Sequence, residues 1–331
     1  MKLKEVIGID VGKESNEGRI HSSQKFLTFE NNTKGFEKFV EWVSKNSSSE
    51  KEQLLFAFEH TGLYSFPLAV FLTEKNYVFV LLPGLELKRS MGITRGKDDK
   101  MDAKRIAQYA YEKRDSIKPY IMPQEEIIQL KRLLTLRERL VKQCSGYKAS
   151  LCEYKQFLKK KDNLTLFETQ EQMIKYLSKY IEKIDNELSS IIKKNDQLKQ
   201  MYDLIVSIKG VGPQTALFMI SYTHGFTRFE TWRQFASYCG VAPFPYQSGI
   251  SIRGRTKVNN LANKKIKSLL DLCAKSSIQF NMEMKMYYEK RVNEGKTKMG
   301  TINIIRNKIL SRIFATVRRG TPYVNTIAYQ S

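Results

Sequence analysis

Hydrophobic and polar positions in the first third of the chain predict a mixed α/β domain. Short apolar runs, some of them alternating, predict strands at residues 4–11, 18–22, 25–30, 54–60 and 77–82. Apolar residues at helical spacing predict helices at residues 33–46, 63–75 and 99–112, the first with Thr33 as its N-cap. The predicted order is three strands, then a helix, a strand, a helix, a strand and a helix.

This order favours one sheet topology. Three consecutive strands suit an antiparallel meander, whereas the later strands alternate with helices and suit parallel additions to the same sheet. We therefore predict an RNase H-like fold for residues 1–122 rather than a doubly wound sheet, in which strands and helices alternate from the start. In an RNase H-like fold the first and fourth strands are neighbours.

The segment that follows is predicted to be helical throughout. Residues 124–209 contain no proline and one glycine, Gly146, and the pattern predicts long helices at 124–160 and 165–199. Their apolar spacing fits an antiparallel hairpin or a coiled coil, which separates two domains or joins two subunits. We assign residues 123–200 to this helical linker.

A second globular unit, mostly helical, is predicted over residues 201–323, followed by a frayed tail at 324–331. A Gly- and Pro-rich insert occupies residues 240–257. Helices are predicted at about 229–238, 258–277, 281–292 and 299–317.

The charge of the chain indicates its class of partner. There are 56 Lys and Arg residues against 34 Asp and Glu residues, a formal net charge of +22. A balance of this sign and size indicates a polyanion, nucleic acid first and an anionic membrane surface second. Residues 1–122 contribute only +3 and the other 209 residues contribute +19, so we expect the binding surface mainly in the latter.

The cysteines and the apolar segments indicate in which cellular compartment the protein is expected. The chain has four cysteines in no CxxC pair and three histidines, which argues against a zinc site and against a disulfide framework. No apolar stretch reaches 18 residues, and the N-terminal apolar run is too short for a signal peptide. We expect a soluble, cytoplasmic or nucleoid-associated protein with reduced structural thiols and no membrane partner.

Two carboxylates follow apolar strands. Asp10 ends the first predicted strand, and Glu59 follows the fourth. If these strands are neighbours, the two carboxylates lie a few ångströms apart, and like charges so close require a shared proton or a divalent cation. The alternative for Asp10 is a side chain that caps a turn.

A second acidic group opens the helix at 99–112. Asp99 and Asp102 stand three residues apart, so both can project from one helix face, and Asp98 competes with Asp99. The helix dipole alone also explains acidic residues in a first turn. With Asp10 and Glu59 these residues would supply oxygen-only ligands, which suit Mg²⁺ or Mn²⁺. Two such ions can stabilise the attacking and leaving oxygens at a phosphate.

The run IKGVGPQTA at residues 208–216 has a helix–Gly-x-Gly–helix pattern, similar to a helix-hairpin-helix element. Backbone N–H groups around Lys209, Gly210 and Gly212 can meet a phosphate there, as helix N-termini do. A glycine-rich turn between packed helices explains the same pattern.

The insert at 240–257 contains Ser248, and it carries three basic residues that suit phosphate contacts, Arg253, Arg255 and Lys257. A serine hydroxyl needs activation before it attacks anything. No histidine is near Ser248 in the sequence, which argues against a Ser/His/Asp hydrolase. An environment with bound metal, supplied by another domain, is one route to activation, and an ordinary loop serine is the alternative.

Together these motifs resemble the DEDD-type transposases of bacterial insertion sequences, which are understood as bridge-RNA-guided recombinases. The segments GIDVGK, FEHTG and KDDKMDAKRIA resemble the family's RuvC-type domain, which has an RNase H fold. The segments IKGVGPQTA, FASYCGVAPFPYQSG and RGRTKVNN resemble its transposase domain. The resemblance covers residues 1–110 and 205–320, in the family's order and joined by a helical region.

The resemblance implies a metal site and a nucleophile. The metal-binding acids would be Asp10, Glu59, Asp99 and Asp102, and the nucleophile would be Ser248, as in a serine recombinase. The family usually has Thr or Ser before the third acid, where this chain has Asp98, so Asp98 stands as an alternative to Asp99. The acids of one subunit and the serine of another would form a composite site in a dimer or tetramer.

The resemblance also implies the partners, which are target DNA, donor DNA and a structured guide RNA that pairs with both. The expected function is RNA-guided DNA recombination through a covalent phosphoserine. Two alternatives are a water-using, metal-dependent endonuclease of the junction-resolving kind and a non-catalytic nucleic-acid scaffold.

Overall fold

A computed structural model describes residues 3–90, 99–248 and 252–324, and the chain divides into two compact units, Met1–Met122 and Pro123–Ser331. Side chains are not described for a few residues within these ranges, among them Asp99, Ser248, Arg253 and Arg255. No helix in the described ranges is long and apolar enough to cross a membrane.

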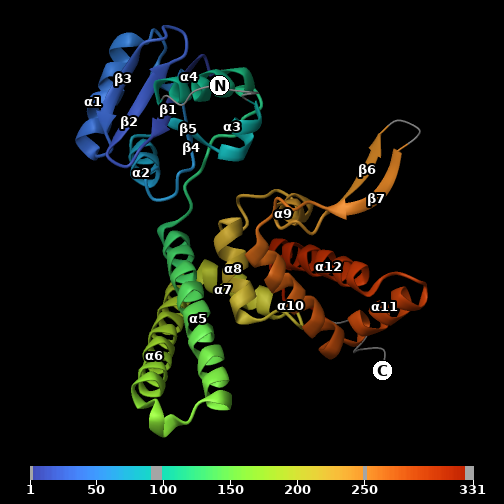
Figure 1. The fold of residues 1–331 in the computed structure, drawn as a ribbon. Coiled ribbons are helices and arrows are strands. Elements are labelled where there is room, and N and C mark those ends of the chain that lie inside the picture. The colour runs from blue at the N-terminus through green and yellow to red at the C-terminus, as the bar shows by residue number, and fades with distance from the viewer. Residues whose placement is uncertain (1–2, 91–98, 249–251, 325–331) are drawn as a thin grey trace. The chain divides into compact units, whose positions relative to one another are not determined.

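The first unit is built on a five-stranded sheet with the strand order β3-β2-β1-β4-β5 (Figure 1). The strands are β1 (Glu5–Val11), β2 (Ser15–Ile20), β3 (Phe26–Glu30), β4 (Leu54–Glu59) and β5 (Val78–Leu82). The first three pair antiparallel, and β4 and β5 are added parallel to β1. The predicted meander, the parallel additions and the adjacency of the first and fourth strands are confirmed.

Alternation along the strands divides the sheet into two buried faces. On one face Ile7, Ile9, Phe56 and Phe58 pack against the helices α1 (Thr33–Asn46) and α2 (Phe66–Glu74). On the other face Val6, Leu55, Ala57 and Val80 pack against α3 (Gly84–Ser90) and α4 (Asp99–Lys113). Phe56 and Phe58 are fully buried, and each contributes about 1.5–3 kcal/mol of transfer free energy.

One local prediction in this unit was wrong, and one short helix was not predicted. Helix α1 is capped by Asn32, whose side chain accepts a hydrogen bond from the Gly35 amide at 2.9 Å, and not by Thr33, which is the first helical residue. The short helix α3 was not predicted, because Pro83 and Gly84 indicate a turn and the seven residues that follow are too few for a periodic signal.

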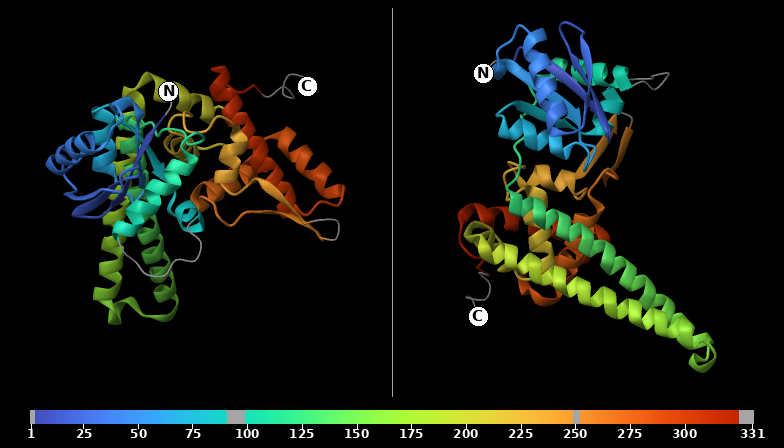
Figure 2. Two further views of the ribbon diagram at one scale, coloured as in Figure 1. Left: turned by 90° about the horizontal axis from the view of Figure 1, so that it is seen from above. Right: turned by 90° about the vertical axis from the view of Figure 1, so that its left-hand side faces the viewer.

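The second unit begins with a long antiparallel hairpin of α5 (Glu125–Phe157) and α6 (Leu164–Lys194), which lie side by side along their length (Figures 1 and 2). The predicted helix over 165–199 is interrupted at Asn195. The Asn195 side chain accepts a hydrogen bond from the Leu198 amide at 3.1 Å and so starts a new helix, α7 (Asp196–Val206).

Among its described residues, the rest of the second unit consists of helices, a β-hairpin and connecting loops. Its elements are α8 (Pro213–Thr223), α9 (Trp232–Tyr238), β6 (Pro243–Ser248), β7 (Ile252–Val258), α10 (Lys264–Phe280), α11 (Met282–Asn293) and α12 (Lys298–Arg319). The helix predicted from residue 258 begins at Lys264, because β7 extends to Val258.

One hydrophobic core unites this unit. Ile127 and Leu130 of α5 and Ile184 and Leu188 of α6 belong to the same buried cluster as the later helices. The predicted boundary near residue 200 remains a prediction, and the segments on its two sides share this core. All four cysteines are free thiols, three buried and Cys152 exposed.

Helix α4 approaches β1 most closely at Gly8. A Cβ atom added to Gly8 would lie 2.3 Å from the backbone nitrogen of Ala107 and 2.4 Å from the carbonyl oxygen of Ala103. No side chain fits between backbone atoms at these distances, so Gly8 and the two alanines permit direct helix–sheet packing.

The substitution Gly8→Ala should therefore push α4 away from the sheet and destabilise this contact by about 1–3 kcal/mol, the usual cost of overpacking. Hydrogen exchange of the β1 and α4 amides measures the effect, which should appear as faster exchange. Gly146→Ala is the matched control, since a Cβ there meets nothing within 4 Å. Unchanged β1 and α4 exchange in Gly8→Ala would show that the close packing is not needed.

Candidate acidic site and nucleic-acid interface

Asp10 and Glu59 lie at equivalent positions near the carboxyl ends of two neighbouring parallel strands. The last paired residues of β1 and β4 are Ile9 and Phe58, so Asp10 and Glu59 are next along the two strands. Neighbouring strands lie about 4.8 Å apart. Because Gly8 and Ala57 face α4, the residues two positions later on each strand face the same side. Both carboxylates therefore emerge at one edge and on one face of the sheet.

Helix α4 runs antiparallel to β1 across this face. Near its end, Tyr111 stacks on His21 with the ring centroids 3.9 Å apart, and the His21 amide donates to the Val6 carbonyl at 2.9 Å. Nearer its start, Ala103 lies against Gly8. The helix therefore proceeds toward its first turn as β1 proceeds toward Asp10.

That first turn carries the other predicted acids. Asp99 is the first residue of α4, one helical turn before Ala103, and its side chain is not described. Asp102 forms an ion pair with Arg105, with 2.9 Å between Oδ1 and Nη1 and with both side chains about a quarter exposed. Asp98 lies outside the described residues. The backbone thus brings the helix start to the strand ends that carry Asp10 and Glu59.

The Glu59 carboxylate is held beside the start of α3. A Cβ atom added to Gly84 would lie 1.9 Å from Glu59 Oε1, so a larger residue there would displace this carboxylate from its present position. Among the described residues, Glu59 accepts no side-chain hydrogen bond and forms no ion pair. A partly buried carboxylate without a partner suits a cation beside it.

Helix α3 is tied to α4 by one hydrogen bond. The Tyr109 hydroxyl donates to Oε1 of Glu86. Burial, followed by the hydrogen bond and the negative charge of Glu86, raises the pKa of Tyr109 to about 12. A tyrosine with a raised pKa stabilises the fold at pH values below its unfolded pKa, and this contribution is lost as the pH rises toward 12. The contact therefore persists throughout the neutral range.

The acidic residues are of the type that binds a divalent cation, but the described side chains are not gathered around one point. Carboxylate oxygens are the ligands that Mg²⁺ and Mn²⁺ prefer. Within residues 3–90, 101–245 and the other described side chains, no three acidic, His or Cys side chains lie close enough to hold a metal ion. Asp102 faces Arg105 in this structure, so its carboxylate would have to leave that ion pair to bind a cation.

In the second unit, the predicted insert forms the β6–β7 hairpin. Ser248 is the last residue of β6 and pairs with Ile252, and Arg253 pairs with Gln247. A bulge in β7 lies opposite Pro245, which has no N–H group for the strand ladder. The side chains of Ser248, Arg253 and Arg255 are outside the described set, whereas Lys257 is exposed.

The segment at 208–216 is packed more tightly than a free phosphate loop. Gly210 has φ +97°, and a Cβ atom there would lie 2.1 Å from the Ser277 hydroxyl oxygen. The Gly212 backbone hydrogen-bonds the buried Cys273 thiol, whose pKa is raised by burial and lowered in part by its hydrogen bonds. Lys209 is exposed beside them. These contacts support the packed turn, and nucleic-acid binding by Lys209, Gly210 and Gly212 remains a prediction.

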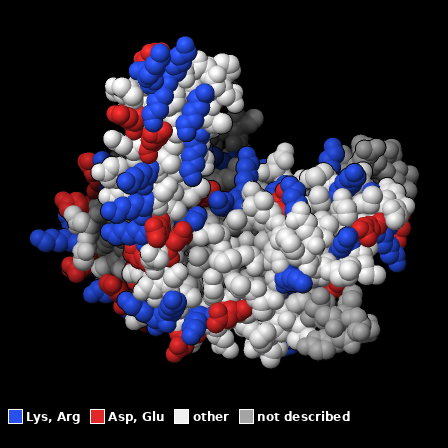
Figure 3. All heavy atoms as spheres, turned by 90° about the horizontal axis from the view of Figure 1, so that it is seen from below, with Lys and Arg blue, Asp and Glu red and all other residues white. Residues whose placement is uncertain are grey.

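The charge of the second unit favours phosphate binding. Residues 201–331 contain 20 basic and only 6 acidic residues. Three of the six, Asp271, Glu283 and Glu294, are already paired with arginines of the same unit. On the face shown in Figure 3, Lys and Arg side chains run along the projecting α5–α6 hairpin, with acidic side chains between them.

Family models match both units. The model for the DEDD-type transposase of IS110 elements, described as "Transposase", matches residues 7–158, and the model "Transposase IS116/IS110/IS902 family" matches residues 202–289. The chain belongs to the IS110-type transposases. The predicted family is confirmed, and as a member this transposase is an enzyme that rearranges DNA.

This transposase also has relatives of nearly equal length. It is 26% identical to the "Pilin gene-inverting protein" of Moraxella bovis over 332 aligned positions, which span 97% of this chain and 98% of the relative. The protein of the same name from Moraxella lacunata matches equally. It is 30% identical over 120 residues to "Insertion element IS110 uncharacterized 43.6 kDa protein" of Streptomyces coelicolor, covering 36% of this chain and 29% of that protein.

If the acidic edge holds a cation, Mg²⁺ should raise the melting temperature of the transposase. At a Mg²⁺ concentration one hundred times the Kd, the free energy of unfolding should increase by about 2.7 kcal/mol. Glu59→Gln should abolish this rise, and without Mg²⁺ it should be at least as stable as the wild type, because one of two neighbouring negative charges is gone. Thermal unfolding with and without Mg²⁺ measures both effects.

Glu52→Gln is the control, since Glu52 is an exposed residue just before β4. It should respond to Mg²⁺ as the wild type does. A rise in Glu59→Gln equal to that of the wild type would place the cation elsewhere.

Proposed function

We propose that this transposase is an RNA-guided DNA recombinase of an insertion sequence, which exchanges DNA strands through Ser248 and a cation-binding acidic cluster. The observation that carries the proposal is the placement of Asp10 and Glu59 at one edge and on one face of the sheet, next to the start of α4. A sheet of order β3-β2-β1-β4-β5, with a meander followed by parallel strands, supports an RNase H-like fold of the RuvC type.

The acids have a definite part in this chemistry. Asp10, Glu59, Asp99 and Asp102 would hold the cation, with Asp98 as the alternative to Asp99. A bound Mg²⁺ or Mn²⁺ would supply stabilisation of negative charge on the attacking and leaving oxygens. Arg105 neutralises Asp102 in the structure and could exchange that carboxylate for a phosphate oxygen when DNA binds.

Ser248 would act as the nucleophile. Its hydroxyl oxygen forms a bond to a DNA phosphorus, the bond from phosphorus to a sugar oxygen breaks, and the serine proton passes to that leaving oxygen. The resulting phosphoserine is then attacked by the sugar hydroxyl of another strand, which releases the serine and restores its proton. Each step exchanges one phosphate ester for another, so no free break remains.

The charge distribution supports partners that are read through their phosphates. Residues 201–331 of the second unit, with 20 basic and 6 acidic residues, can bind DNA and RNA backbones without reading bases. Base pairing with a guide RNA would then select target and donor DNA. The names of the Moraxella relatives, which refer to inversion of a pilin gene, support DNA rearrangement by a full-length chain of this kind. A dimer or tetramer would allow the acids and Ser248 to come from different subunits.

The second candidate is a water-using, metal-dependent endonuclease. It is favoured by the acidic edge alone, because that edge needs no serine to cleave a phosphodiester.

Labelled target and donor DNA, incubated with the transposase, its guide RNA and Mg²⁺, should give a covalent protein–DNA adduct on a denaturing gel. Ser248→Ala should abolish the adduct and strand exchange, and Ser251→Ala, the next serine in the sequence, should retain both. Cleavage that forms no adduct and that persists in Ser248→Ala would show that the protein acts as the water-using endonuclease and not as the serine recombinase. Binding without cleavage, unaffected by Asp10→Asn, would indicate a scaffold.

DNA binding should weaken steeply with salt, because each phosphate contact releases a counterion. A surface that makes about 6–10 phosphate contacts loses roughly 10³- to 10⁵-fold in affinity between about 50 and 200 mM salt. Fluorescence anisotropy with a labelled duplex, titrated at several salt concentrations, gives the slope. A slope near zero would contradict a phosphate-tracking surface.

A further inference from the structure

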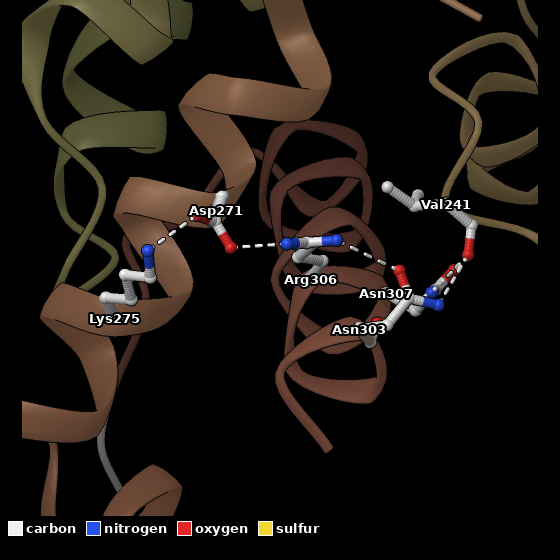
Figure 4. A network of polar contacts seen from close by, with 6 residues as sticks. All are labelled: Val241, Asp271, Lys275, Asn303, Arg306 and Asn307. Carbon is white, nitrogen blue, oxygen red and sulfur yellow. Dashed lines mark hydrogen bonds and ion pairs between the residues drawn. The ribbon is translucent and has the colours of Figure 1, made fainter. Parts of the chain in front are cut away.

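The root of the β6–β7 hairpin is held by a polar network on α12 (Figure 4). The carbonyl oxygen of the buried residue Val241, two residues before β6, accepts hydrogen bonds from Nδ2 of Asn303 at 2.9 Å and from Nδ2 of Asn307 at 3.0 Å. Asn307 also donates to the Asn303 carbonyl at 2.9 Å. Two amides therefore fill both acceptor positions of one buried carbonyl.

Arg306 fixes the orientation of the first amide. Its Nη1 donates to Oδ1 of Asn303 at 3.4 Å, which leaves the Asn303 Nδ2 group facing Val241. Its Nη2 donates to Oδ1 of Asp271 in α10, and the other oxygen of Asp271 lies 2.9 Å from Nζ of Lys275. The Arg306 side chain is only 9% exposed.

The Asp271 carboxylate remains charged in this setting. Burial by itself would raise the pKa of Asp271, but the hydrogen bonds from Arg306 and Lys275 outweigh burial and keep the pKa below its usual value. The ion pair with the Asp271 carboxylate fixes the position of the Arg306 guanidinium. Because this guanidinium also donates to Asn303, it fixes the orientation of the Asn303 amide.

The second root of the hairpin, where the chain leaves β7, is also attached to the helical core. After β7, the Asn263 amide donates to the Tyr238 carbonyl at 2.9 Å, and Nδ2 of Asn263 donates to the Tyr238 hydroxyl oxygen at 3.2 Å. The same Asn263 side chain caps α10 by accepting from the Ile266 amide. Both roots of the hairpin are therefore attached to the helical core.

An isolated two-stranded hairpin is marginally stable, so contacts with the helical core at its two roots are needed to hold it in one orientation. Ser248 lies seven residues beyond Val241, at the other end of β6. A rotation at the root is carried along the ribbon, so the contacts at Val241 decide where the backbone of Ser248 is presented.

We propose that Asn303, Asn307 and Arg306 are positioning residues, which clamp the root of the β6–β7 hairpin and thereby place Ser248 for attack on the DNA phosphate. None of the three needs to touch the substrate. The proposal depends on the proposed function only for the role of Ser248, since the clamp itself is a property of the hairpin.

The test compares Asn303→Ala, Asn307→Ala and the double variant in the full-length protein. Each single variant leaves one amide on the Val241 carbonyl and should slow adduct formation by about threefold. The double variant should slow it by more than about thirtyfold, well beyond the roughly ninefold loss that two independent effects would give. The DNA concentration for half-maximal rate should stay unchanged in all three. Hydrogen exchange of the amides in β6 and β7 should be faster in the double variant.

Glu283→Gln is the matched control. It removes the partner of Arg312, another arginine on α12, from a contact that involves α11 and no hairpin residue. This control should keep the hairpin exchange and the adduct rate of the wild type. Equal slowing in Glu283→Gln and in the double variant would show a general effect on stability and overturn the clamp.

The exchange measurement also separates the two proposals. If Ser248→Ala keeps full activity, the serine mechanism fails, while faster hairpin exchange in the Asn303→Ala/Asn307→Ala variant still supports the clamp. If hairpin exchange is unchanged in that double variant, the clamp is wrong whatever Ser248 does.

Discussion

The parallel pairing of β1 with β4 determines what the acidic edge can do. Continuation of its register beyond Ile9 and Phe58 places Asp10 and Glu59 on adjacent strands, and the alternation of side chains turns both toward α4. Two carboxylates at this spacing repel each other, and the repulsion grows as water is excluded. A divalent cation between them would remove this repulsion, and this is the reason why we propose that the acidic edge binds one.

Small residues surround this edge of the sheet. Gly8 and two alanines let α4 lie directly on β1, which brings the acidic first turn of the helix to the strand ends. Gly84 leaves space for the Glu59 carboxylate at the start of α3. Larger side chains at Gly8 or Gly84 would bury more apolar surface, but they would separate or displace the charged groups. At this edge, small residues therefore give up some apolar burial and keep the acidic residues close together.

The sequence predicted the elements of the first unit well, because its strands are short apolar runs with clear interruptions. It predicted the pairing of the first and fourth strands from the order of elements alone, and the structure confirms it. The exchange of Thr33 for Asn32 as the cap shows a limit: both residue types cap helices, and only the backbone geometry distinguishes them. The break at Asn195 was hidden for a similar reason, since apolar periodicity continues across it.

The second unit was less predictable, because its decisive contacts join residues far apart in sequence. Two prolines and several glycines in the insert indicate a loop, yet the segment pairs as a hairpin with a bulge opposite Pro245. The amides that hold Val241 lie 62 and 66 residues further along the chain, on a helix whose pattern shows only an ordinary polar face. No local pattern announces such a contact. Nor does periodicity show that Arg306 is buried and paired with Asp271.

We propose that Asp10 and Glu59 together bind one divalent cation. Anomalous diffraction from crystals of the transposase grown with Mn²⁺ tests it most directly, because the signal locates the ion without any assumption about activity. We expect a peak within coordination distance of both carboxylates, at about 2.0–2.3 Å from an oxygen of each. A peak at other residues only, with Asp10 and Glu59 pointing apart, would contradict it.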